Sequence, residues 1–181
     1  AAQIAAMKAG EVDIASLLSF QNIPEIEKLD TVNLVVVPSG YQESWFMNLS
    51  TDPKTQGHPA LQDVNVRKAV VMAVDREKII KDLLGGQTKV SATFWEGTPY
   101  ADPNAMLLPY DPEGSKKMLD DAGWKVGADG VRTKGGVKLK PRYSPPDKEI
   151  RKKVQVVVQQ MLQEVGVDTT LINNTGDVIF Q

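Results

Sequence analysis

Few residues in this chain are of the types, or at the spacing, that catalysis requires. The only histidine, His58, lies between Gly57 and Pro59 and is expected in a surface loop. No cysteine is present, so neither a thiolate zinc site nor a cysteine nucleophile is possible. The sequence also lacks the serine-nucleophile motif G-x-S-x-G and the phosphate-binding motifs G-x-G-x-x-G and Walker A. We therefore expect no enzyme activity, no metal site and no bound cofactor.

The residues that could contact a small molecule are aromatic and amide side chains near strand ends and in loops. Trp45 lies at the entry of an expected strand and Trp95 in a proline-rich loop, where partly exposed rings can stack on a ligand. The other candidates lie at the end of, or directly after, two expected strands and are Tyr143, Ser144, Asn173 and Asn174. An alternative is that the tyrosine packs in the core and that the two asparagines only form a turn.

A strand–helix–strand unit in the last third of the chain is expected to position these loops. Residues 137–143 alternate apolar and polar side chains, as a half-buried strand does, and residues 167–172 form a second strand. Between them, seven apolar residues mark one amphipathic helix over residues 147–165, namely Ile150, Val154, Val157, Val158, Met161, Leu162 and Val165. Such a βαβ unit is expected to be parallel and right-handed. Ligands of open α/β sheets bind at the carboxyl ends of the strands, which here lead into the candidate residues.

The other segments also indicate a mixed α/β protein. An apolar stripe over residues 66–73 predicts a helix, Asp75 is a suitable N-cap for the next helix, and Gly85 ends it. Asp111 and Pro112 begin a further helix, and turn dipeptides at residues 129–130 and 135–136 predict a hairpin. The remaining predictions are a helix over residues 1–9, strands over 32–37 and 45–49, and loops over 51–60 and 90–109.

Composition excludes some classes of partner. The chain has 181 residues, of which 41% are hydrophobic and 24% charged, as in a globular protein. Its net charge of −2, without a basic run, gives no support to nucleic-acid binding. No apolar run is long enough to span a membrane, and no signal peptide is recognisable, although a mature exported protein would have lost one.

Several segments resemble motifs of the family 5 extracellular solute-binding proteins, the peptide-binding proteins of ABC importers. Residues 63–80, DVNVRKAVVMAVDREKII, are similar to the family block D-V-R-V-R-x-A, followed by D-R-x-x-I, with Asn65 in place of the first arginine. Residues 45–49 resemble an aromatic-x-F-N-T stretch of the family, which adds Asn48 to the candidate ligand-binding residues. Further similar segments, in the family order, are residues 7–15, 110–124 and 129–136.

This resemblance implies an α/β fold, namely a periplasmic-binding-protein-like lobe of type II with a βαβ unit and a mixed sheet flanked by helices. Residues 1–40 correspond to the tail of the first lobe and the crossover, and residues 41–181 to the second lobe, incomplete at its C-terminal end. The acidic residue with which the family holds a peptide's amino group is expected beyond Gln181.

The implied function is capture of a solute, with an oligopeptide favoured, for import through ABC permease subunits. The implied protein is an extracytoplasmic monomer, in the periplasm or on the cell surface as a lipoprotein, and it does not bind nucleic acid. A regulator's ligand-sensing domain with the same fold is one alternative. An enzyme is a second alternative, disfavoured by the missing acid–base residues.

Overall fold

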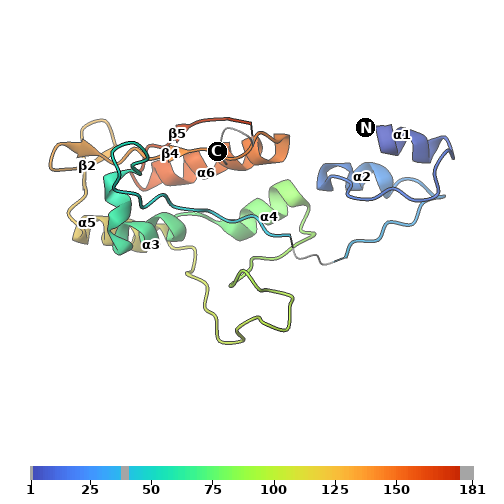
Figure 1. The fold of residues 1–181 in the computed structure, drawn as a ribbon, viewed down its shortest axis with the longest axis horizontal. Coiled ribbons are helices and arrows are strands. Elements are labelled where there is room, and N and C mark those ends of the chain that lie inside the picture. The colour runs from blue at the N-terminus through green and yellow to red at the C-terminus, as the bar shows by residue number, and fades with distance from the viewer. Residues whose placement is uncertain (1, 38–40, 176–181) are drawn as a thin grey trace.

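A computed structural model describes residues 2–37 and 41–175 of the chain (Figure 1). The N-terminal part carries α1 (Ala2–Lys8), the 3-10 helix η1 (Phe20–Asn22) and the short helix α2 (Ile23–Ile26). Figure 1 shows α1 and α2 at one end of the molecule, apart from the helices and strands of residues 41–175. The helix predicted at the N-terminus is confirmed, and the predicted boundary at residue 40 falls outside the described residues.

The helices after residue 58 begin and end largely where the sequence predicts. A second 3-10 helix, η2 (Pro59–Gln62), leads into α3 (Val64–Met72), which α4 (Arg76–Leu84) follows closely. Asp75 caps α4 as predicted, because its carboxylate accepts a hydrogen bond of 2.9 Å from the backbone N–H of Lys78. Gly85 ends α4 with a φ of 63°, a conformation that favours glycine. The next helices are α5 (Pro112–Asp121), capped by Asp111, and α6 (Glu149–Glu164).

The core forms where α3, α5 and α6 turn their apolar faces inward. Ser115 of α5 lies fully buried against α3 and donates a 2.8 Å hydrogen bond to the carbonyl of Ala69. The main buried residues of this core come from all three helices and from the segments that adjoin the strands, and include Val66, Val70, Leu119, Trp124, Leu139, Val158, Leu162 and Val167. This core supports the sheets and holds their ends in place.

The strands are divided between two small sheets instead of one mixed sheet. The first is an antiparallel meander of β1 (Lys125–Val126), β2 (Arg132–Lys134) and β3 (Val137–Lys138), which confirms the predicted hairpin. The second pairs β4 (Arg142–Tyr143) in parallel with β5 (Thr170–Leu171), and α6 connects them, as the βαβ prediction requires.

One long strand over residues 137–143 was predicted, and the structure splits it. Leu139 lies between the two halves, donating its N–H to the carbonyl of Arg132 (2.7 Å) and accepting the N–H of Asp168 (3.1 Å). The chain therefore leaves one sheet and joins the other at this buried residue.

The predicted strands at residues 32–37 and 45–49 are wrong. Within the described ranges, neither segment is assigned to a strand or pairs with one. β-Branched composition alone cannot form a ladder, because each strand needs a neighbour for its backbone hydrogen bonds. The predicted loop over residues 90–109 is confirmed, since it contains only turns.

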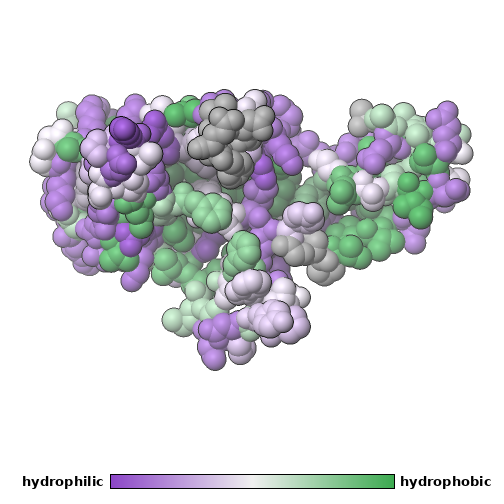
Figure 2. Space-filling model, viewed as in Figure 1, coloured by the Kyte–Doolittle hydropathy of each residue, from purple (hydrophilic) through white to green (hydrophobic). Residues whose placement is uncertain are grey.

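The N-terminal part exposes a large apolar surface. Ile14 and Leu17 are 85% and 93% exposed, and Val35 and Val37 are also largely exposed. Figure 2 shows the hydrophobic residues of this part gathered at the right of the view. Across residues 2–37 and 41–175, no helix is both long and apolar enough to cross a membrane.

Candidate functional site

The carboxyl ends of β4 and β5 bring four of the predicted site residues together. Since the two strands are parallel, Tyr143 and Ser144 leave β4 at the edge where Asn173 and Asn174 follow β5. The pairing continues beyond the strands in a parallel bridge between Pro146 and Asn174. The N–H of Asp147 also donates to the carbonyl of Asn174 at 3.0 Å. We call this region the β4/β5 edge.

Trp45 reaches the same edge from a distant part of the sequence. Its indole N–H donates a 3.1 Å hydrogen bond to the hydroxyl oxygen of Tyr143, and the two rings meet edge to face with centroids 5.6 Å apart. Because an indole nitrogen can only donate, the tyrosine oxygen is the acceptor. Among the described residues, the phenolic proton has no acceptor, so the pair presents an aromatic wall with a hydroxyl donor.

The phenol of Tyr143 is held in its protonated form. Burial raises the pKa of this phenol, the hydrogen bond from Trp45 lowers it, and the negative charge of Glu43 raises it further, with a net upward shift. A neutral hydroxyl at this edge can donate a hydrogen bond to a carbonyl or carboxylate oxygen of a ligand.

A second polar group at the edge is the side-chain hydroxyl of Ser144. Its hydroxyl oxygen is buried and has no hydrogen-bond partner among the described residues. An unpartnered buried hydroxyl is uncommon, since it loses its bonds to water. Ser144 therefore adds an unsatisfied polar group beside Tyr143.

Charged side chains flank the aromatic pair. Arg151, in the first turn of α6, donates from Nε (3.1 Å) and Nη2 (2.5 Å) to the carboxylate of Glu43, 108 residues away. The arginine side chain is 24% exposed and the glutamate 74%. The ion pair fixes the segment that carries Trp45 onto α6, although a pair this exposed contributes little free energy.

A pocket lies between the N-terminal part and the start of α6. Its volume is about 370 Å³, and it is lined by Leu17, Leu18, Ser19, Phe20, Gln21, Lys148, Glu149 and Ile150. Residues 148–150 directly follow the loop that leaves β4, so the pocket adjoins the β4/β5 edge in sequence. The two parts of the chain thus form opposite walls of one cavity.

Two predicted site residues lie elsewhere. The side chain of Asn48 folds back locally, donating to the carbonyl of Thr55 (2.8 Å) and accepting the N–H of Ser50 (2.9 Å). Trp95 lies on the long loop before α5, where its ring contacts Phe94 and Tyr100 with centroids 5.7 and 6.1 Å away. Within the described part of the chain, neither side chain forms a hydrogen bond or a ring contact with the β4/β5 edge.

Sequence reasoning missed Glu43 and Arg151. The arginine lies in the first turn of a helix that was predicted, and basic residues there oppose the helix dipole, which is a usable signal. Nothing in the local sequence marks Glu43, because its partner is a hundred residues away.

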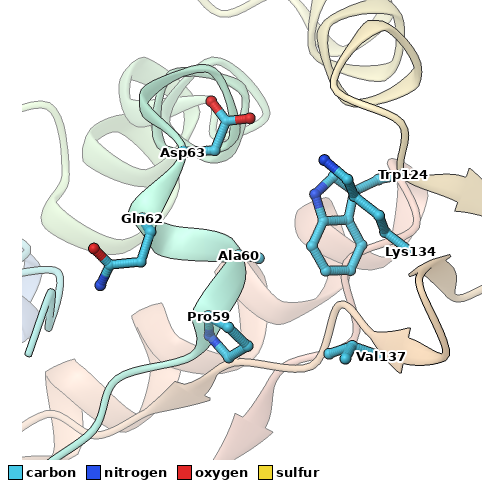
Figure 3. Close-up of a pocket in the computed structure, with 7 residues that line it drawn as sticks. All are labelled: Pro59, Ala60, Gln62, Asp63, Trp124, Lys134 and Val137. Atoms are coloured by element: carbon cyan, nitrogen blue, oxygen red, sulfur yellow. The ribbon is translucent and has the colours of Figure 1, made fainter. Parts of the chain in front are cut away.

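A separate pocket of about 270 Å³ lies between η2 and the antiparallel meander (Figure 3). It is lined by Pro59, Ala60, Gln62, Asp63, Trp124, Lys134 and Val137, none of which belongs to the β4/β5 edge. His58 lies beside it, half-buried instead of on the surface as predicted. Its Nε2 is 2.9 Å from the carbonyl of Lys138, while its Nδ1 accepts the N–H of Ala60 at 3.2 Å. These bonds give His58 a structural role.

Comparison with known proteins gives one consistent result. Residues 1–177 match the family model described as bacterial extracellular solute-binding proteins, family 5 middle. The oligopeptide-binding protein AppA of Bacillus subtilis (strain 168) is 30% identical over 112 residues, which are 59% of this chain and 21% of AppA. The nickel-binding periplasmic protein of Escherichia coli (strain K12) is 29% identical over 121 residues, which are 65% of this chain and 23% of that protein.

A solved structure agrees with this assignment. NikA from Brucella suis, in complex with Fe(III)-EDTA, superposes with a TM-score of 0.78 at 27% identity, covering 97% of this chain and 35% of NikA. The chain therefore spans about a fifth to a third of the length of these relatives. With nearly its whole length matched, the chain belongs to family 5 of the bacterial extracellular solute-binding proteins and has their α/β, periplasmic-binding-protein-like fold.

Proposed function

We propose that this chain captures a solute, an oligopeptide in the first instance, and delivers it to the permease of an ABC importer outside the cytoplasm. The observation that carries the proposal is the family match over residues 1–177. AppA, among the relatives, is named as an oligopeptide-binding protein. A ligand-sensing role in a regulator is not favoured, because relatives are named as an oligopeptide-binding protein, a nickel-binding periplasmic protein and a putative ABC transporter peptide-binding protein.

The solute binds at the β4/β5 edge and in the adjoining pocket. Tyr143 offers its phenolic proton, and the buried hydroxyl of Ser144, unpartnered among the described residues, directly follows it in the chain. The side chains of Asn173 and Asn174 extend the same edge with amide donors and acceptors. Such groups suit a peptide backbone, whose carbonyl and N–H groups are the same whatever the side chains.

Residues 1–40 act as the tail of the first lobe and residues 41–181 as the second lobe in this account. Closure of the two lobes buries the solute from both sides, which increases the contact area and excludes water. Asn48 and Trp95 belong to the same second lobe as the β4/β5 edge, so lobe closure alone does not bring them to a solute bound there. The segment around Leu17 forms the facing wall.

A second candidate solute is a nickel chelate, because one relative is named as a nickel-binding periplasmic protein. Within the described ranges, no three His, Cys, Asp or Glu side chains are grouped to hold a bare metal ion. A nickel solute would thus bind this part of the chain through the organic groups of its chelator.

Calorimetric titration tests the proposal. We expect residues 1–181 to bind a pool of tri- to pentapeptides measurably but more weakly than micromolar, because the second wall is only partly present. A nickel chelate in a parallel titration distinguishes the two solutes. Absence of any heat with the folded chain would contradict solute capture, whereas micromolar or tighter binding would contradict the two-lobe account.

A further inference from the structure

A buried amide joins the ends of the two parallel strands. Gln155 of α6 is only 1% exposed, and its Nε2 donates to the carbonyl of Tyr143 at 2.7 Å. The same nitrogen lies 3.4 Å from the carbonyl of Ile172, which directly follows β5. One side chain therefore contacts both strands at the level of the β4/β5 edge.

An amide is energetically unfavourable at this buried position unless it forms hydrogen bonds. A buried amide without hydrogen bonds costs free energy relative to an apolar side chain, so its bonds must compensate for lost hydration. The backbone already closes one bond here, since the N–H of Ile172 donates to the carbonyl of Tyr143 at 3.0 Å. The Gln155 side chain adds a second link between the same two residues, and its attachment to α6 fixes the direction of the amide.

We propose that Gln155 is a positioning residue for the solute site. This role rests on the proposed function only for the identity of what the β4/β5 edge binds. It does not reach the solute. By holding the carbonyls of Tyr143 and Ile172 from behind, it sets the separation of the two strand ends. The Tyr143 side chain is thereby aimed at Trp45, and its phenolic proton faces the site.

The helix supplies a matched control one turn later. Gln159 makes a similar bond, its Nε2 donating to the carbonyl of Thr169 at 2.7 Å. That carbonyl precedes β5, on the side away from the β4/β5 edge. Loss of Gln159 therefore removes a comparable hydrogen bond without releasing the strand ends.

The test uses the indole resonances of the ¹⁵N-labelled chain without solute. The chain has three tryptophans, and Trp45 is assigned by its loss in Trp45→Phe. In Gln155→Met, we expect the Trp45 resonance to move toward its position in Tyr143→Phe, where the indole has lost its acceptor. In Gln159→Met, we expect Trp45 to stay in place. In both variants, buried Trp124 should keep its native resonance and so report an intact core.

An unmoved Trp45 resonance in Gln155→Met, or an equal movement in Gln159→Met, would overturn the proposal. If Gln155→Met does not fold, Gln155→Asn is used instead, since it keeps an amide but withdraws it by one methylene. It should shift the Trp45 resonance in the same direction. Because no solute is present, failure here leaves solute capture standing. Failure of the calorimetric titration, in turn, leaves the positioning role of Gln155 standing.

Discussion

Gly166 lies directly against the side chain of Arg132: a Cβ atom at residue 166 would be 2.8 Å from Arg132 Cγ. The arginine cannot move aside easily, because it is 2% exposed and donates to the carbonyls of Val165 and Trp124, both at 2.7 Å. It also binds the carboxylate of Asp120 at 2.8 Å. Arg132 thus joins the ends of α5 and α6 to the meander, and Gly166 leaves the space for it.

Gly166→Ala is expected to lower the free energy of unfolding by about 2–4 kcal/mol, measured by urea denaturation. Two effects add, since φ is +83° at this residue and the new methyl group would collide with Arg132. Gly130→Ala is the control, because φ is +80° there but nothing lies within 4 Å of the added atom. The control should lose only about 1 kcal/mol. Equal losses in the two variants would show that the contact with Arg132 does not matter.

Asp75→Ala should destabilise the chain by about 1 kcal/mol, because it removes the side-chain cap of α4. Asp75→Asn keeps an oxygen acceptor and should retain most of the stability. Neither change should affect solute binding, since the Asp75 carboxylate caps α4 and, among the described residues, forms no hydrogen bond with the β4/β5 edge. A stable Asp75→Ala chain that no longer binds solute would reverse this assignment.

The Arg132–Asp120 pair predicts a pH dependence. The hydrogen bond from Arg132 is the main reason why the pKa of Asp120 is below its ordinary value of 3.8. The unfolded chain therefore takes up a proton at higher pH than the folded chain. The pair stabilises the fold fully above that ordinary pKa, and the stabilisation is lost as the pH falls through the lower, folded pKa.

Asp120→Asn should accordingly reduce the free energy of unfolding at neutral pH and flatten its loss below about pH 4. The effect will be modest, because the Asp120 side chain is 45% exposed to solvent. Urea denaturation between neutral and acid pH measures it. In an Arg132→Met background the same change should have much less effect, and an undiminished effect would exclude Arg132 as the cause.

The helices and their caps could be predicted from the sequence, because they depend on residues close together in the chain. Features that depend on contacts between distant residues could not. The caps at Asp75 and Asp111 depend on residues within one turn, and the sequence identified both. The prediction of a strand at residues 32–37 was wrong, because valines indicate a preference for extended backbone but do not identify a partner strand. The βαβ pattern predicted that Tyr143 and the two asparagines meet at the strand ends, because the pattern is continuous in sequence. The contact of Glu43 with Arg151 could not be predicted in this way, because it spans 108 residues.

The three tryptophans allow the most direct test of the proposed site. Trp45 reports on the β4/β5 edge, Trp124 on the pocket beside η2, and Trp95 on the long loop. We propose following their indole resonances while a tri- to pentapeptide pool is added to the ¹⁵N-labelled chain. We expect a saturable shift of the Trp45 resonance that Tyr143→Phe weakens, with the Trp124 resonance unchanged. A saturable shift of Trp124 with Trp45 unmoved would place the solute in the other pocket and contradict the account.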